Sequence, residues 1–126
     1  MWKSTINGKG FPMQLVTKEI ERKLPPLRST ENFPPENVDV VVKFFAPWTG
    51  LQLADWRGIG GFKRWTWYAT EGEKQSDGDW VFYGLVDGFE PELGQWMLSD
   101  LEQITGPMGL KIERDRGFTA KLSEVM

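Results

Sequence analysis

The chain has 126 residues, of which 40% are hydrophobic and 26% charged, and it contains neither cysteine nor histidine. This length suits one core, and the composition is that of a globular domain rather than a disordered chain. Without Cys or His, the chain cannot form disulfides, zinc sites of the thiolate or imidazole type, or Ser-His-Asp triads. We expect residues 1–126 to form a single domain that has no catalytic residues we can name, no metal site and no cofactor.

Two further exclusions concern localisation. No stretch approaches the roughly 18 apolar residues of a membrane span, and the first residues lack the apolar run of a signal peptide. We therefore expect a cytoplasmic protein that does not contact a membrane.

The first predicted elements lie before residue 63. Thr17–Leu24 is typical of a short helix that begins with an N-cap threonine and ends at Pro25-Pro26. Val38–Ala46 is dense in β-branched and aromatic residues, which predicts a central strand. Thr49–Phe62 holds four glycines and shows no periodicity, so we expect a long loop there.

The middle of the chain predicts an antiparallel hairpin. Arg64–Thr70 alternates large and polar residues with the period of a half-buried strand. Asp79–Val86 is a second strand, and Asp77-Gly78 between them is a turn signal, although the connection from Glu71 is long for a tight turn.

The last third predicts shorter elements. Gln95–Leu98 is a short strand, and Ser99 with Glu102 matches a capping box, so a helix should start at Ser99 and end at Gly106-Pro107. Leu110–Arg114 is a candidate edge strand. Together these elements predict an α+β fold with a mainly antiparallel sheet of about four or five strands and one or two short helices.

Several of these segments together resemble a known family. They are VVVKFFAPW (residues 40–48), TWYATEGE (66–73), DGDWVFYGLVDGFEPELG (77–94), and LSDLE followed by GPMGLKIERD (106–115). The resemblance is to an uncharacterised bacterial family, domain of unknown function 2958, and would extend from about Leu24 onward. Because members are common on plasmids, phages and integrative elements, it implies a mobile-element setting. It implies no activity and no site residues.

Charge is distributed unevenly along the chain. Residues 1–70 carry a net charge of +4, residues 71–102 carry −8, and the remainder carries +1. Because acidic residues in turns reach solvent, we predict a concentrated negative patch that attracts a basic protein and repels phosphate backbones. Acidic turns that serve only solubility are the alternative. The acidic residues of this block are Glu71, Glu73, Asp77, Asp79, Asp87, Glu90, Glu92, Asp100 and Glu102, of which the first seven are our candidate partner-binding residues.

Two tryptophans complete the candidate contact residues. Most of the seven Trp and eight Phe lie in strand-like segments, where large rings fill a packed face. Trp48 and Trp56 lie beside or inside the predicted glycine-rich loop, so we expect them to be exposed.

Two functions from different classes remain. The first is a mobile-element or phage accessory protein whose acidic surface binds a basic host protein, such as a defence protein or one that handles nucleic acids. In one version of this hypothesis the binding inhibits the host protein. The second is a small carboxylate-dependent hydrolase or carbohydrate-binding module that uses acidic and Trp residues. We favour the first, a non-enzymatic one, and with a sequence pI near 5.0 we expect no direct binding to nucleic acid.

Overall fold

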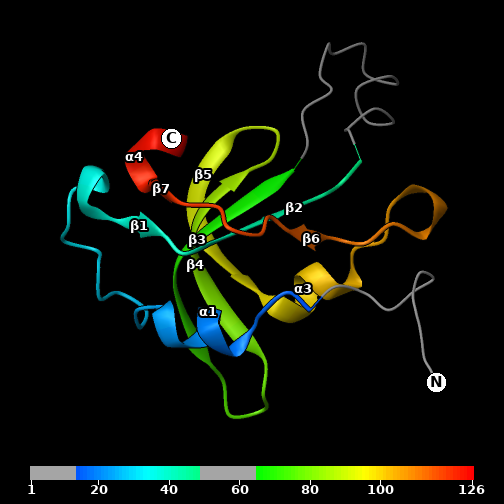
Figure 1. Cartoon of the computed structure of the whole chain (residues 1–126), viewed down its shortest axis with the longest axis horizontal. Helices are drawn as coiled ribbons and strands as arrows, with labels where there is room; N and C mark the ends of the chain where they lie inside the picture. The colour runs from blue at the N-terminus through cyan, green and yellow to red at the C-terminus, as the bar shows by residue number, and fades with distance from the viewer. Residues whose placement is uncertain (1–13, 49–64) are drawn as a thin grey trace.

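The computed structural model of the chain describes residues 14–48 and 65–126 (Figure 1). Within these residues, a five-stranded antiparallel sheet has the order β5-β4-β3-β2-β6, and β1 pairs with β7 in a separate two-stranded sheet. The strands are β1 (Asp39–Val40), β2 (Val42–Phe45), β3 (Thr66–Lys74), β4 (Trp80–Asp87), β5 (Pro91–Met97), β6 (Glu113–Arg114) and β7 (Ala120–Lys121).

The helices are short and lie around the sheets (Figure 1). The N-cap predicted for the first one is confirmed, because the Thr17 hydroxyl accepts a hydrogen bond from the Ile20 amide at 3.3 Å. No helix in the described part of the chain is long and apolar enough to cross a membrane. The helices are α1 (Lys18–Lys23), α3 (Leu98–Gln103) and α4 (Leu122–Val125), with 3₁₀ turns η1 (Pro35–Asn37) and η2 (Pro107–Gly109). The α+β prediction is confirmed.

The main core lies on one face of the five-stranded sheet. Phe82, the third residue of β4, is fully buried and lies 5.3 Å from Phe44 and 5.7 Å from Trp96, measured between ring centroids. Leu24 and Leu101 from the helical segments belong to the same cluster. A smaller cluster of Val38, Leu85 and Leu122 packs β1 and α4 against the rest of the fold.

The strand expected over Val38–Ala46 is divided into β1 and β2, because the chain changes partners within it, and only β2 belongs to the five-stranded sheet. Val40 ends the pairing with β7, and Val42 begins the pairing with β3. Between them, the Val41 amide donates to the Ala69 carbonyl at 2.9 Å. Because the buried positions keep the same alternation through both strands, the sequence pattern looks like that of one strand.

The hairpin is confirmed, but β3 continues further than predicted. A bulge interrupts the register between Ala69 and Glu71, after which β3 runs to Lys74. The Gln75 amide then donates to the Asp79 carbonyl at 2.7 Å and closes a short turn. The first half of the long connection inferred from Glu71, up to Lys74, is therefore strand.

The last predicted boundaries also shift. β5 starts at Pro91 rather than Gln95, and α3 spans Leu98–Gln103 rather than starting at Ser99. The capping box of Ser99 with Glu102 is wrong: the Asp100 carboxylate accepts from the Met97 amide at 3.1 Å instead. A strand is present near the predicted edge segment, as β6 beside β2.

A matched pair of glycines tests the packing of β4. Gly84 and Gly94 face each other on β4 and β5. A Cβ at Gly84 would lie 1.8 Å from the Tyr68 carbonyl oxygen, whereas a Cβ at Gly94 has open space around it. We expect Gly84→Ala to lower the free energy of unfolding by at least about 1–3 kcal/mol, and Gly94→Ala to change it little. Urea denaturation of both variants measures this, and equal stabilities would contradict the close approach.

Candidate functional site

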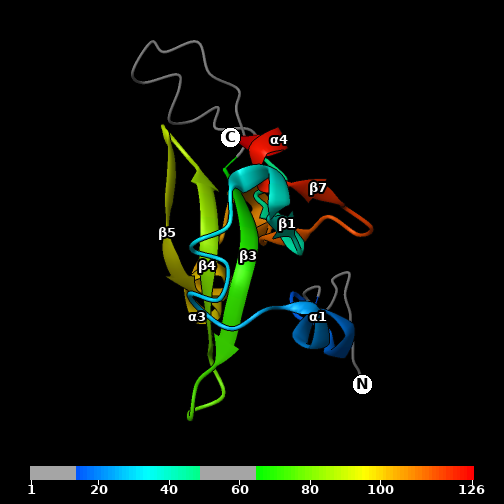
Figure 2. The same ribbon diagram turned by 90° about the vertical axis from the view of Figure 1, so that its left-hand side faces the viewer.

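The acidic block does not form one patch. Asp77 and Asp79 lie in the β3–β4 turn, whereas Glu90 and Glu92 lie where β4 leads into β5. The eight residues of β4 separate these two groups by roughly 25 Å, at about 3.3 Å per residue. Figure 2 shows the two turns at opposite ends of the sheet. The single negative patch predicted from the charge run is therefore wrong, because adjacent strands in a hairpin carry neighbouring acidic segments to opposite ends.

Glu71 is not a surface residue. Its side chain is only 2% exposed, and its carboxylate accepts hydrogen bonds from the Arg28 amide at 2.7 Å and the Thr30 amide at 3.0 Å. The Thr30 hydroxyl donates to it as well. Because β2 begins opposite Ala69 and does not extend along β3 as far as Glu71, the carboxylate anchors the loop after α1 where a neighbouring strand would otherwise lie. The expected exposure of Glu71 in a turn is wrong.

The Asp79 carboxylate also accepts hydrogen bonds from within the fold. Its carboxylate accepts from the Ser99 hydroxyl at 2.6 Å, the Ser99 amide at 3.1 Å and the Trp80 amide at 2.8 Å. The hydrogen bond from the Ser99 hydroxyl is the largest cause that holds the pKa of Asp79 below its ordinary value. Asp77 stays exposed, and one of its oxygens accepts from the Asp79 amide at 2.9 Å. The Asp79 carboxylate therefore joins the turn to α3, whereas the Asp77 hydrogen bond stays within the turn.

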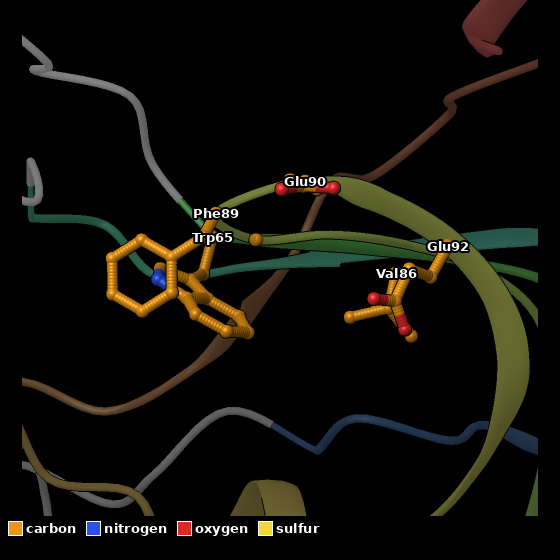
Figure 3. A pocket seen from close by; sticks show the side chains of 6 residues that line it. Trp65, Val86, Phe89, Glu90 and Glu92 are labelled. Atoms are coloured by element: carbon orange, nitrogen blue, oxygen red, sulfur yellow. The ribbon is translucent and has the colours of Figure 1, made fainter.

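A hollow of about 280 Å³ lies at the other end of the sheet, where β3 begins and β4 ends (Figure 3). Trp65 and Phe89 meet edge to face, with ring centroids 5.4 Å apart and an interplanar angle of 80°. Figure 3 shows these rings together on one side, with Glu92 beside Val86 on the other and Glu90 along the rim. The lining residues are Trp65, Val86, Gly88, Phe89, Glu90 and Glu92.

Local sequence explains how the hollow forms. Val86 and Glu92 are cross-strand partners in β4 and β5, so they share one face of the sheet. A Cβ at Gly88 would lie 2.4 Å from the Trp65 ring, and the absence of a side chain there lets the indole pack against the turn. Phe89 is 61% exposed although it is a large apolar residue.

Among the residues that the structure describes, the two charged residues that line this hollow are both acidic. Glu90 and Glu92 are exposed and form no hydrogen bond or ion pair with any residue that the structure describes. Two carboxylates beside two aromatic rings can hold a cation, because ring faces attract positive charge and carboxylates pair with it.

Of the two tryptophans that we predicted to be exposed contact residues, only Trp48 lies within the described part of the chain. Trp48 is half-buried and packs against the main core, and a Cβ at Gly106 would lie 2.5 Å from its ring. Its expected exposure is wrong. Trp56 and the predicted loop Thr49–Phe62 lie outside the described residues. Sequence reasoning placed Trp65 in the core and overlooked Phe89, whose position between a turn glycine and Glu90 is the signal that could have found it.

A second, larger hollow of about 730 Å³ lies beside β1 and β7. Its charged lining residues are of both signs, and Lys121 and Asp39 already pair at 2.6 Å. Since these charges compensate one another, this surface selects no class of partner by charge.

One comparison with known proteins gives a match. The family model described as a protein of unknown function, DUF2958, matches residues 60–124, slightly more than half of the chain. The chain belongs to this family. The matched part starts later than the expected Leu24 and includes all the residues that line the 280 Å³ hollow. No curated protein and no solved structure matches significantly.

The buried carboxylate of Glu71 can be tested against an exposed carboxylate for its contribution to the stability of the fold. Glu71→Gln keeps one acceptor oxygen but places an amide donor against either the Arg28 or the Thr30 amide, so we expect a loss of about 1–3 kcal/mol in the free energy of unfolding. Glu73→Gln is the matched control, since Glu73 is exposed and a glutamine oxygen can still accept from the Leu27 amide. It should cost less than about 0.5 kcal/mol. Chemical denaturation of both variants distinguishes them, and equal losses would contradict the anchoring role.

The Ser99 hydroxyl gives a pH-dependent test. A carboxyl whose pKa is lowered by folding adds stability above its unfolded pKa, about 3.9 for Asp, and loses it as the pH falls through the lower folded pKa. Ser99→Ala should raise the pKa of Asp79, and its stability deficit should be larger at pH 7 than at pH 3. NMR titration of the Asp79 carboxyl measures the shift. Ser76→Ala, in the same turn, should leave that titration unchanged.

Proposed function

We propose that this chain is an accessory binding protein of a plasmid, phage or integrative element, which binds and inhibits a basic host protein. The observation that carries the proposal is the hollow at the β4–β5 end, in which Trp65 and Phe89 lie beside Glu90 and Glu92. We assign the partner contact to this end of the sheet rather than to the whole acidic block.

The hollow is small. Its volume of about 280 Å³ is at the lower end of the range of about 300–1,000 Å³ for ligand pockets, so it suits a compact group such as the end of one side chain. An arginine or lysine matches its chemistry, since the cation would pair with a carboxylate while its stem packs on the rings.

Charge supports the same class of partner. Glu90 and Glu92 are not neutralised by any described basic residue, so their field extends into solvent and speeds encounter with a basic surface. Such a surface is typical of proteins that handle nucleic acids, which links the proposal to defence or nucleic-acid-handling hosts. The same field opposes direct binding of nucleic acid by this chain.

A carbohydrate-binding or hydrolase function has less support. Sugar binding needs an open ring face, and the Trp65 indole is half-buried against Gly88 and Phe89. Trp48, which would have favoured that function had it met two carboxylates in a cleft, does not line the hollow.

Two double variants test the proposal with equal changes in charge. Glu90→Gln with Glu92→Gln removes two negative charges at the hollow, and Glu73→Gln with Asp77→Asn removes two at the hairpin turn. We expect the first to slow association with captured bacterial proteins by about tenfold at low salt and to flatten the salt dependence, because it removes the steering charges. The second should capture the same proteins at nearly the original rate.

The comparison is read by affinity capture from bacterial lysate, followed by kinetics on the captured protein. Equal effects of the two double variants would show that only net charge matters. Unchanged capture by the first would reduce the acidic residues to solubilising turn chemistry.

A further inference from the structure

β5 is an edge strand of the five-stranded sheet. It spans seven residues, pairs with β4 on one side, and has no strand partner on its other side among the residues that the structure describes. Figure 2 shows β5 at the outer margin of the sheet. An edge of this kind presents unpaired amides and carbonyls to which another strand can add.

Three observations fix which backbone groups of β5 point outward. Pro91 has no amide to donate to β4, the Met97 amide donates to the Asp100 carboxylate, and the carbonyl of Tyr83 accepts from the Thr70 hydroxyl on β3. Tyr83 is the β4 partner of Gln95, so its carbonyl is turned away from β5. Because antiparallel pairs alternate between bonded and non-bonded, the backbone groups of Leu93 and Gln95 face outward.

The side chains of β5 define what would lie beside it. Glu92 pairs with Val86 and lies on the face of the hollow, whereas Leu93 pairs with Leu85 and lies on the opposite face. Leu93 is 46% exposed. An added strand would therefore meet a carboxylate on one face and an apolar residue on the other.

We infer that the partner adds a β-strand along β5, antiparallel or parallel to it, with basic residues on the face of the hollow and apolar residues on the other face. This inference rests on the proposed function for the sign of the charge. One basic side chain of the added strand lies next to Glu92 and enters the hollow between Phe89 and Glu90. A second copy of this chain is a poorer occupant, since residues 90–97 carry two glutamates and no basic residue.

The probe is an eight-residue peptide of alternating Arg and Val, blocked at both ends. A control peptide has the same sequence but carries N-methyl groups on central backbone amides that point to either side of the extended peptide. The methyl groups prevent strand pairing along both sides and leave the charge unchanged. We expect the control to bind at least about tenfold more weakly, the loss that corresponds to one hydrogen bond. Amide exchange at Leu93 and Gln95 should slow by at least about tenfold with the first peptide only.

A pair of variants tests the same contact from the protein side. Gln95→Pro removes an outward amide at a position where an edge strand tolerates proline, and Gln95→Ala keeps that amide. The first should weaken binding of the alternating peptide by about tenfold, and the second by less than about twofold. Thermal unfolding of both variants shows whether each is folded.

The outcomes separate the inference from the proposed function. Equal affinities for the two peptides, or unchanged exchange at Leu93 and Gln95, overturn strand addition, while a dependence on Glu90 and Glu92 would leave the proposed function standing. If the peptide binds equally well to the variant with Glu90→Gln and Glu92→Gln, the proposal of a basic partner is overturned instead. If the chain alone sediments as a dimer with those amides protected, a second copy occupies the edge and the inference fails.

Discussion

The packing of Phe82 is the contact on which the rest of the structure depends. This ring is fully buried on β4 and contacts Phe44 from β2 and Trp96 from β5, while the Trp80 ring stacks near it at 6.2 Å. Each such pair adds about 0.5–1.5 kcal/mol beyond the burial of apolar area. Because one ring contacts strands on both sides, the registers of β2, β4 and β5 are fixed together. The positions of Val86 and Glu92 at the end of the sheet follow from that register.

The strands that the sequence predicts are those in which local pattern and tertiary packing agree. Arg64–Thr70 and Asp79–Val86 alternate because one face of each strand packs on this aromatic cluster. Both strands can therefore be predicted from the sequence, although β3 extends beyond the predicted end. The failures have tertiary causes. Ser99 lies inside α3, whose N-cap position is Met97, and its hydroxyl donates to Asp79, 20 residues earlier. The break at Val41 arises because the strand partner changes there from β7 to β3, and the alternation of buried and exposed residues gives no sign of that change.

The site was less predictable than the fold, because charge along a sequence does not state where strands end. Acidic residues on both sides of β4 seemed contiguous, yet the hairpin separates them. Trp65 packs against the main core, as its alternation with Trp67 predicts, but its ring also meets Phe89, which the alternation does not show. The composition indicated an acidic protein with many aromatic residues. Only the fold shows which of them meet.

The acidic residues divide according to what folding requires of them. Glu71, Asp79 and Asp100 accept hydrogen bonds that hold a loop, a turn and a helix, and any partner that competed for them would destabilise the fold. Glu90 and Glu92 accept none from the described residues. Since an exposed ion pair contributes only about 0–1 kcal/mol, folding loses little when these two have no ion-pair partner in the described part of the chain. Their charge is then available for association at the end of the sheet where an exposed aromatic residue and an open strand edge also lie.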